Sequence, residues 1–133
     1  MKYVEYATTG LLGLIFFVFG INQLLNLGIV PAPPPMSETA MAYMGGLGAS
    51  GYFFPVLKLT ETICGALLLA RVLVPLAGVI LTPIVLQIFL FHAVLAPAGL
   101  PIAILLLVLI VAGAYFYRES FKGLLTFRAK PAV

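Results

Sequence analysis

Lys58 and Glu61 are two oppositely charged residues that stand inside an otherwise apolar run from residue 52 to residue 70. On a helix, side chains three positions apart share a face, so this ammonium and carboxylate can form an ion pair. A charged side chain at the centre of a bilayer costs about 2.5–3.5 kcal/mol even on the lenient insertion scale. The pair is therefore a candidate ligand-binding or proton-transfer site. In the alternative interpretation, Lys58 extends to the headgroups and Glu61 pairs with Asn22 or Gln87.

Four further polar side chains could join this pair, because each falls near the same end of an apolar run. They are Asn22, Gln23, Gln87 and His92. If these runs cross a bilayer as helices, with 1.5 Å of rise per residue, these four side chains lie in the same half of the bilayer as Lys58 and Glu61. The orientation derived below makes this the outer half. The sequence therefore predicts a polar pocket open to the outer face. Histidine commonly acts in proton transfer, so His92 is a candidate for that role, although a satisfied interfacial histidine is the alternative interpretation.

Redox and metal chemistry is limited by the small number of ligating residues. The chain has one cysteine, Cys64, and one histidine, which excludes an intrachain disulfide, a CxxC motif and bis-histidine haem ligation within one chain. We expect Cys64 to be an unreactive buried thiol, because reactive thiols need exposure and a basic neighbour. The sequence predicts no metal site and no catalytic constellation that works alone, so whether the protein is an enzyme stays open.

The composition indicates whether these segments are surrounded by water or by lipid. The chain has 133 residues, of which 63% are hydrophobic and 8% charged, whereas soluble domains carry about 25% charged residues. We therefore expect a single integral membrane domain over residues 1–133, in contact with the lipid bilayer. The formal charge of +3 comes from basic residues beside apolar runs, a distribution that does not favour nucleic-acid binding.

Four apolar segments are long enough to cross the hydrocarbon core, which needs about 20 helical residues. They cover approximately residues 7–27, 52–70, 73–95 and 99–117. Backbone groups inside lipid need internal hydrogen bonds, so the segments must be helices. The short connections after the second and third segments make consecutive helices antiparallel neighbours. The predicted fold is an all-α, four-transmembrane-helix antiparallel bundle. The first segment resembles a signal peptide superficially, but Glu5 and the absence of an A-x-A-like site favour a retained span.

The first connection, residues 28–51, is the long one. It opens with Pro31 and the run 33–35 and continues with Ser37, a typical N-cap residue. We expect a short helix over about residues 37–45, lying in the outer membrane interface.

Glycine and proline mark the expected helix packing. Gly13 and Gly20 share one face of the first segment, and Gly65 lies in the second, so these small residues should allow close helix–helix approach. Pro83, in the middle of the third segment, should kink its helix because proline lacks the amide proton.

The basic residues predict the orientation. All of them except Lys58 flank the apolar segments on one side: Lys2, Arg71, Arg118, Lys122, Arg128 and Lys130. Basic residues collect in cytoplasmic loops, so both termini should be cytoplasmic.

Three segments resemble the DoxX-like family of small membrane proteins. They are the first-helix run from Gly13 to Leu24, the run 55–65 with its acidic residue and glycine, and the turn 91–101. The resemblance covers about residues 11–127, with Gly20, Gln23, Glu61 and Gly65 at matching positions. It implies a four-helix protein of the bacterial inner membrane. It also implies an association with quinone-linked redox assemblies, but no defined catalytic set.

Three functions remain open from the sequence. The first is a membrane component of a redox-linked assembly that holds a quinone and meets a redox protein partner. The second is a non-enzymatic binder or carrier of a small polar or lipidic ligand, in which a homo-oligomer could supply symmetry. The third is a structural accessory subunit whose polar groups serve helix association alone. A quinone or a bound lipid is the only cofactor that the residues suggest.

Overall fold

A computed structural model describes residues 1–133 as helices and connecting turns, with no strand. The α-helices are α1 (Lys2–Leu25), α2 (Glu38–Ala49), α3 (Phe53–Ala70), α4 (Val74–Val94), α5 (Leu100–Phe116) and α6 (Arg118–Phe121). Two 3₁₀ turns, η1 (Pro97–Gly99) and η2 (Lys122–Leu125), precede α5 and follow α6. The predicted all-α class is confirmed.

Four helical segments are long and apolar enough to cross a membrane, namely α1, α3, α4 and the unit of η1 with α5. They correspond to the four predicted segments, with shifted bounds. α1 begins at Lys2 and ends at Leu25, and its C-cap residue, Asn26, adopts a left-handed conformation with φ 51°. Hydropathy marks only the lipid-embedded part of a helix, so the polar first turn at residues 2–6 lay outside the prediction. α2 runs to Ala49 because Gly45, Gly46 and Gly48 remain helical.

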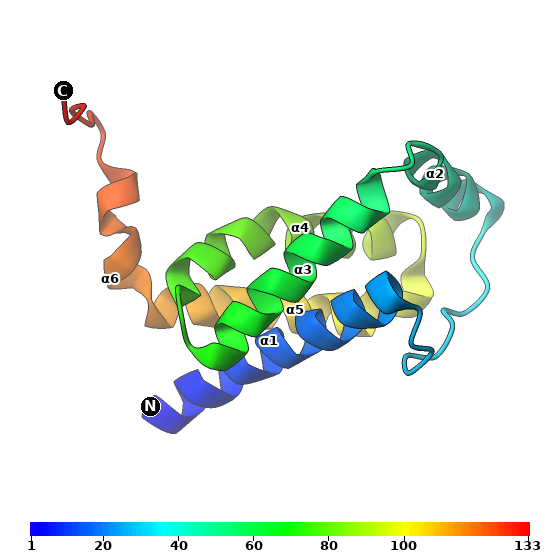
Figure 1. Cartoon of the computed structure of the whole chain (residues 1–133), viewed down its shortest axis with the longest axis horizontal. Coiled ribbons are helices and arrows are strands. Elements are labelled where there is room, and N and C mark those ends of the chain that lie inside the picture. The colour runs from blue at the N-terminus through cyan, green and yellow to red at the C-terminus, as the bar shows by residue number, and fades with distance from the viewer.

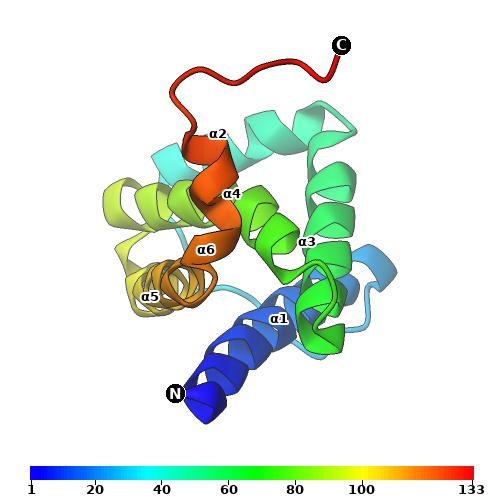
Figure 2. The same cartoon turned by 90° about the vertical axis from the view of Figure 1, so that its left-hand side faces the viewer.

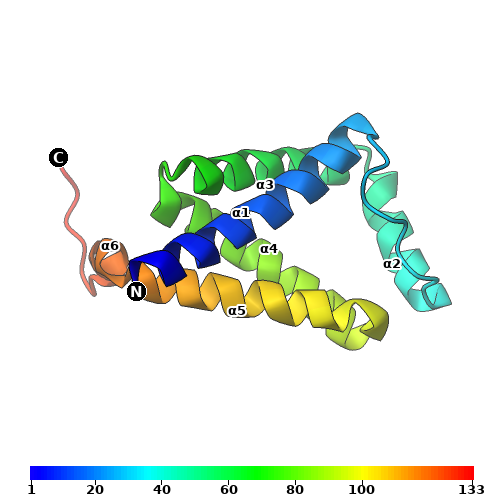
Figure 3. The ribbon, with the colours of Figure 1, turned by 90° about the horizontal axis from the view of Figure 1, so that it is seen from below.

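The long helices lie side by side along the longest axis of the molecule (Figure 1). The N-terminus, the α3–α4 turn and α6 lie at one end, which we call the terminal end. The other end carries η1 and α2, and α2 crosses it outside the four long helices (Figure 3). Figure 2 looks onto the terminal end and shows α1, α3, α4 and α5 around a common centre, with α6 rising from the end of α5.

The contact between α1 and α3 depends on three glycines. A Cβ at Gly65 would lie 2.5 Å from the backbone nitrogen of Phe17, and one at Gly13 would lie 2.8 Å from Leu68 Cβ. A Cβ at Gly20 would overlap Thr62. Gly13 thus meets the later part of α3 and Gly20 its earlier part. The two backbones approach so closely that no larger residue fits without displacement.

The core between the four long helices is apolar. α1 contributes Leu12 and Phe16, α3 contributes Leu68, α4 contributes Leu81 and Val85, and α5 contributes Leu106 and Ile110. Large apolar side chains also cover the outer surface, including Leu14, Ile63, Leu86 and Val108. This outer surface suits contact with lipid. α4 is a single helix through Pro83, and Pro83 is exposed on its surface; the kink stays a prediction.

Candidate functional site

The buried face of α3 holds the Lys58–Glu61 pair. Glu61, Cys64, Gly65 and Leu68 are the buried residues of this helix, and their spacing of three and four places them on one stripe. Lys58 lies one turn before Glu61, and its Nζ donates to Glu61 Oε2 over 3.0 Å. The side chains of Lys58 and Glu61 are 17% and 3% exposed. The ion pair is therefore formed within one helix, with the carboxylate almost fully enclosed.

This pair lies near the middle of the apolar helix. Glu61 follows Phe53, the first residue of α3, by eight positions and precedes Ala70, the last, by nine, which is about 12–14 Å from either end. The ammonium of Lys58 has three N–H donors, and one is used for Glu61. The pair therefore keeps donors for a ligand with carbonyl or anionic oxygens.

Asn22 closes the turn that follows α1. Its Oδ1 accepts hydrogen bonds from the amides of Ile29 at 2.8 Å and Val30 at 3.3 Å. The side chain of Gln23 is exposed. These two predicted site residues thus have no hydrogen bond to Lys58 or Glu61.

Gln87 connects α4 with α2. Its Nε2 donates to the hydroxyl of Tyr43, and the Tyr43 ring stacks on Phe91 with 5.7 Å between centroids. This hydrogen bond is exposed, so Gln87 holds α2 against the bundle from outside.

His92 lies in the last turn of α4, at the end of the molecule that carries α2. Its Nδ1 is 3.0 Å from the carbonyl oxygen of Ala96, and the ring lies so close to Gly99 that a Cβ there would overlap it. His92 also lines a cavity of about 140 Å³ with the segments 33–37 and 95–99. Of the six predicted site residues, only Lys58 and Glu61 bond to each other.

A second polar grouping, which sequence reasoning missed, lies at the terminal end. We call Glu5, Thr9, Arg71 and Tyr117 the terminal cluster. Arg71 Nη2 donates to both carboxylate oxygens of Glu5, at 2.8 and 3.1 Å. The Tyr117 hydroxyl donates to Glu5 Oε1 at 2.6 Å, and the Thr9 hydroxyl lies 3.3 Å from the same oxygen. One carboxylate thus joins α1 to the ends of α3 and α5.

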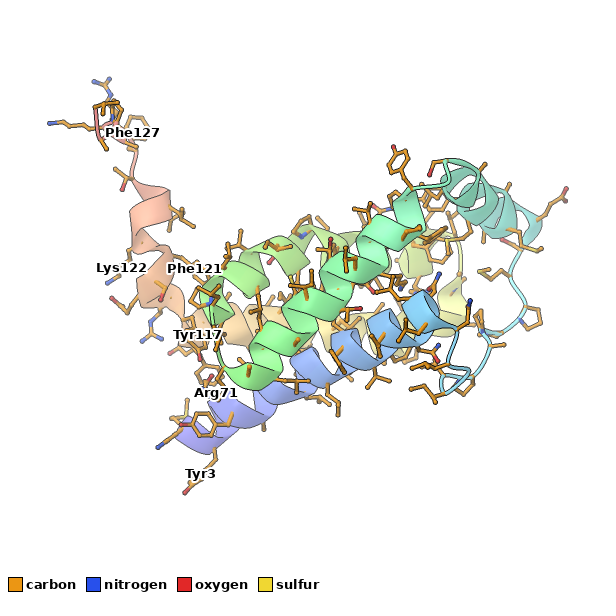
Figure 4. The ribbon with its side chains drawn as sticks, in the orientation of Figure 1. Tyr3, Arg71, Tyr117, Phe121, Lys122 and Phe127 are labelled. Atoms are coloured by element: carbon orange, nitrogen blue, oxygen red, sulfur yellow. The ribbon has the colours of Figure 1, made fainter.

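The backbone at the end of α3 positions Arg71. This residue caps α3 in the left-handed conformation, with φ 61° and ψ 33°, and lies beside Tyr117 (Figure 4). Its guanidinium is 3.8 Å from the centroid of the Tyr6 ring, a cation–π distance. Desolvation opposes the charge, but the hydrogen bond and charge of Glu5 outweigh it and raise the pKa of Arg71. The only signal of this cluster in the sequence was Glu5, an acidic residue close to the basic Lys2.

A small cavity of about 50 Å³ lies beside the terminal cluster. Thr9 and Tyr117 line it together with side chains of α3, α4 and α5, and Phe121 of α6 contributes to its wall. The lining is mostly apolar, so the space suits part of an alkyl chain. No group of three or more histidine, cysteine or acidic side chains could hold a metal ion.

Comparison with known proteins gave no match. No protein-family model, no curated protein sequence and no solved structure matches this chain.

Proposed function

We propose that the chain is a multi-pass protein of the bacterial inner membrane, with its four long helices forming an antiparallel bundle and both termini in the cytoplasm. The four apolar helices and the reversed order of the α1–α3 contacts support the bundle. The basic residues beside the terminal end support the orientation, because positive charge accumulates in cytoplasmic loops. In this placement α2 lies in the outer interface, where its exposed Tyr43 suits the headgroup region.

Within this bundle, the Lys58–Glu61 pair is the binding site for a lipid-soluble ligand of the quinone class, and the chain is the membrane component of a redox-linked assembly. The observation that carries the proposal is an ion pair of 3.0 Å on the buried face of α3. An intramembrane ionisable residue marks a functional site by default, because its burial is expensive. The DoxX-like resemblance points to the same ligand class.

The chemistry of the pair fits a quinone. A quinone has two carbonyl oxygens that accept hydrogen bonds, and Lys58 has unused N–H donors beside the carboxylate. When bound, the quinone supplies electron-carrying capacity that the amino acids of this chain lack. Lys58 would orient a carbonyl oxygen, and Glu61 would hold or receive a proton. Electrons would come from a redox protein partner.

A structural accessory role is the second candidate. No buried side-chain nitrogen or oxygen lacks a hydrogen-bond partner, and Asn22, Gln87 and His92 are all bonded to nearby groups. A protein that binds no ligand would need such hydrogen bonds within the chain for its buried polar groups.

Ligand extraction separates these candidates. The protein is purified in mild detergent and its organic extract is measured by mass spectrometry, for the wild type and for Lys58→Met and Glu61→Gln. We expect about one isoprenoid quinone per chain in the wild type and at least a tenfold loss in Lys58→Met. Glu119→Gln is the matched control, because Glu119 forms an exposed i,i+3 pair with Lys122 and should retain the ligand. Extracts that contain only phospholipid in all four proteins would favour the accessory role.

A further inference from the structure

The charge of the chain is concentrated in one short segment. Residues 118–130 contain four basic side chains, namely Arg118, Lys122, Arg128 and Lys130, and one acidic side chain, Glu119. Their net charge of +3 equals the formal charge of the whole chain, because the other three basic and three acidic residues cancel. The rest of the molecule is therefore neutral overall, and this segment carries the excess positive charge of the chain.

The same segment exposes large apolar side chains. Leu124, Leu125 and Phe127 are 72%, 82% and 95% exposed, although α5, which comes just before, contributes to the core. Exposed apolar side chains among basic residues are typical of segments that lie in a membrane interface. The apolar groups enter the acyl region and the basic groups meet the headgroups.

The position of the segment fits this surface. α6 and the chain after it leave the terminal end at an angle to the long helices, with Phe121, Lys122 and Phe127 along their course (Figures 1 and 4). Tyr117, bonded to Glu5 and Arg71, fixes where the segment starts. A segment that starts at the end of a spanning helix and turns aside runs along the membrane plane.

We infer that residues 118–130 form a membrane-surface anchor that binds the anionic phospholipid headgroups of the leaflet at the terminal end. Each basic residue near an anionic surface strengthens binding about fivefold. Lys122 is also 2.6 Å from Glu119, but this pair is exposed, so a phosphate can compete for the ammonium. The inference rests on the membrane placement in the proposed function and is independent of any ligand at Lys58 and Glu61.

The absence of tryptophan from the chain makes a sharp test possible. Phe127→Trp places a single reporter in the anchor, and Phe19→Trp places one on the outer surface of α1, where Phe19 is 43% exposed. Each full-length variant is reconstituted into nanodiscs of phosphatidylcholine and phosphatidylglycerol in which one of the two lipids carries brominated acyl chains. Bromine quenches tryptophan fluorescence only at close range, so quenching reports which lipid lies beside the reporter.

We expect brominated phosphatidylglycerol to quench the Phe127→Trp reporter several-fold more than brominated phosphatidylcholine, and high salt to abolish the preference. Adding Lys122→Gln, Arg128→Gln and Lys130→Gln should also remove it, whereas the Phe19→Trp reporter should be quenched equally by both lipids. Equal quenching of the anchor reporter by the two lipids, or none, would overturn the anchor. If the reporter at position 19 were also unquenched, the membrane placement itself would fail, which separates the two results.

Discussion

The Lys58–Glu61 pair and the terminal cluster use the same kind of interaction for different ends. Lys58 and Glu61 lie on one helix and are 17% and 3% exposed, so their ion pair joins no second element. The ion pair of Arg71 with Glu5 is 37% and 14% exposed and, with Tyr117, ties three helices together. The more buried pair contributes less to the architecture.

This contrast separates polar groups that stabilise the fold from polar groups that are free to bind a ligand. Desolvating two charges is expensive, and the attraction between them often only offsets that penalty. The Lys58–Glu61 pair carries this penalty without connecting helices, and this is why we propose a ligand there. The terminal cluster lies at a helix end where part of its hydration remains, so its hydrogen bonds can contribute to folding at a smaller penalty.

Removing one charge from the buried pair should have the largest effect. Lys58→Met leaves the Glu61 carboxylate enclosed without its cation, and we expect a loss of about 3–5 kcal/mol in the free energy of unfolding. The measurement is far-UV circular dichroism during titration with a denaturing detergent. The double variant Lys58→Met/Glu61→Met should recover most of the loss, because neither charge is then buried. A single variant as stable as the wild type would show that the ammonium does not compensate Glu61.

The next largest effect should come from the α1–α3 contact on the same face of α3. In Gly65→Ala the new Cβ would meet the backbone of Phe17 at 2.5 Å, so the helices must separate, at a cost of about 1–3 kcal/mol. Gly10→Ala is the matched control, because a Cβ at Gly10 would have no atom of a neighbouring helix within 4 Å. That variant should gain about 0.5–1 kcal/mol from helix propensity. Equal melting temperatures for both alanine variants would contradict the close approach.

The smallest effect should come from one hydrogen bond of the terminal cluster. Tyr117→Phe removes the donor to Glu5 Oε1, and we expect a loss of about 1 kcal/mol. A double-mutant cycle with Arg71→Gln measures whether the two donors act together. Because both bind one carboxylate, their effects should be less than additive. Strict additivity would mean that the cluster does not act as a unit, and the contrast with the buried pair would disappear.

Sequence patterns predicted the elements better than the site. The four apolar helices follow from hydropathy. Their observed bounds differ from the predicted ones mainly at polar ends such as residues 2–6, where the helix continues beyond its apolar residues. The Lys58–Glu61 pair was also predictable, since both side chains lie on one turn. Asn22, Gln87 and His92 were predicted to join that pair, but projection onto depth ignores direction around each helix. In the structure each bonds to a nearby turn or to α2 instead.

Four features follow from the order of the residues alone: the all-α class, the four apolar helices, the local ion pair and the concentration of charge in residues 118–130. These features depend on composition and on spacing within a helix, which the backbone hydrogen-bond period dictates. Helix packing, in contrast, brings Glu5 to Arg71 and Tyr117, which lie 66 and 112 residues away in the chain. These contacts depend on how the glycine faces of α1 and α3 pack and on the position that the α3–α4 turn gives to Arg71. No periodic pattern encodes that geometry.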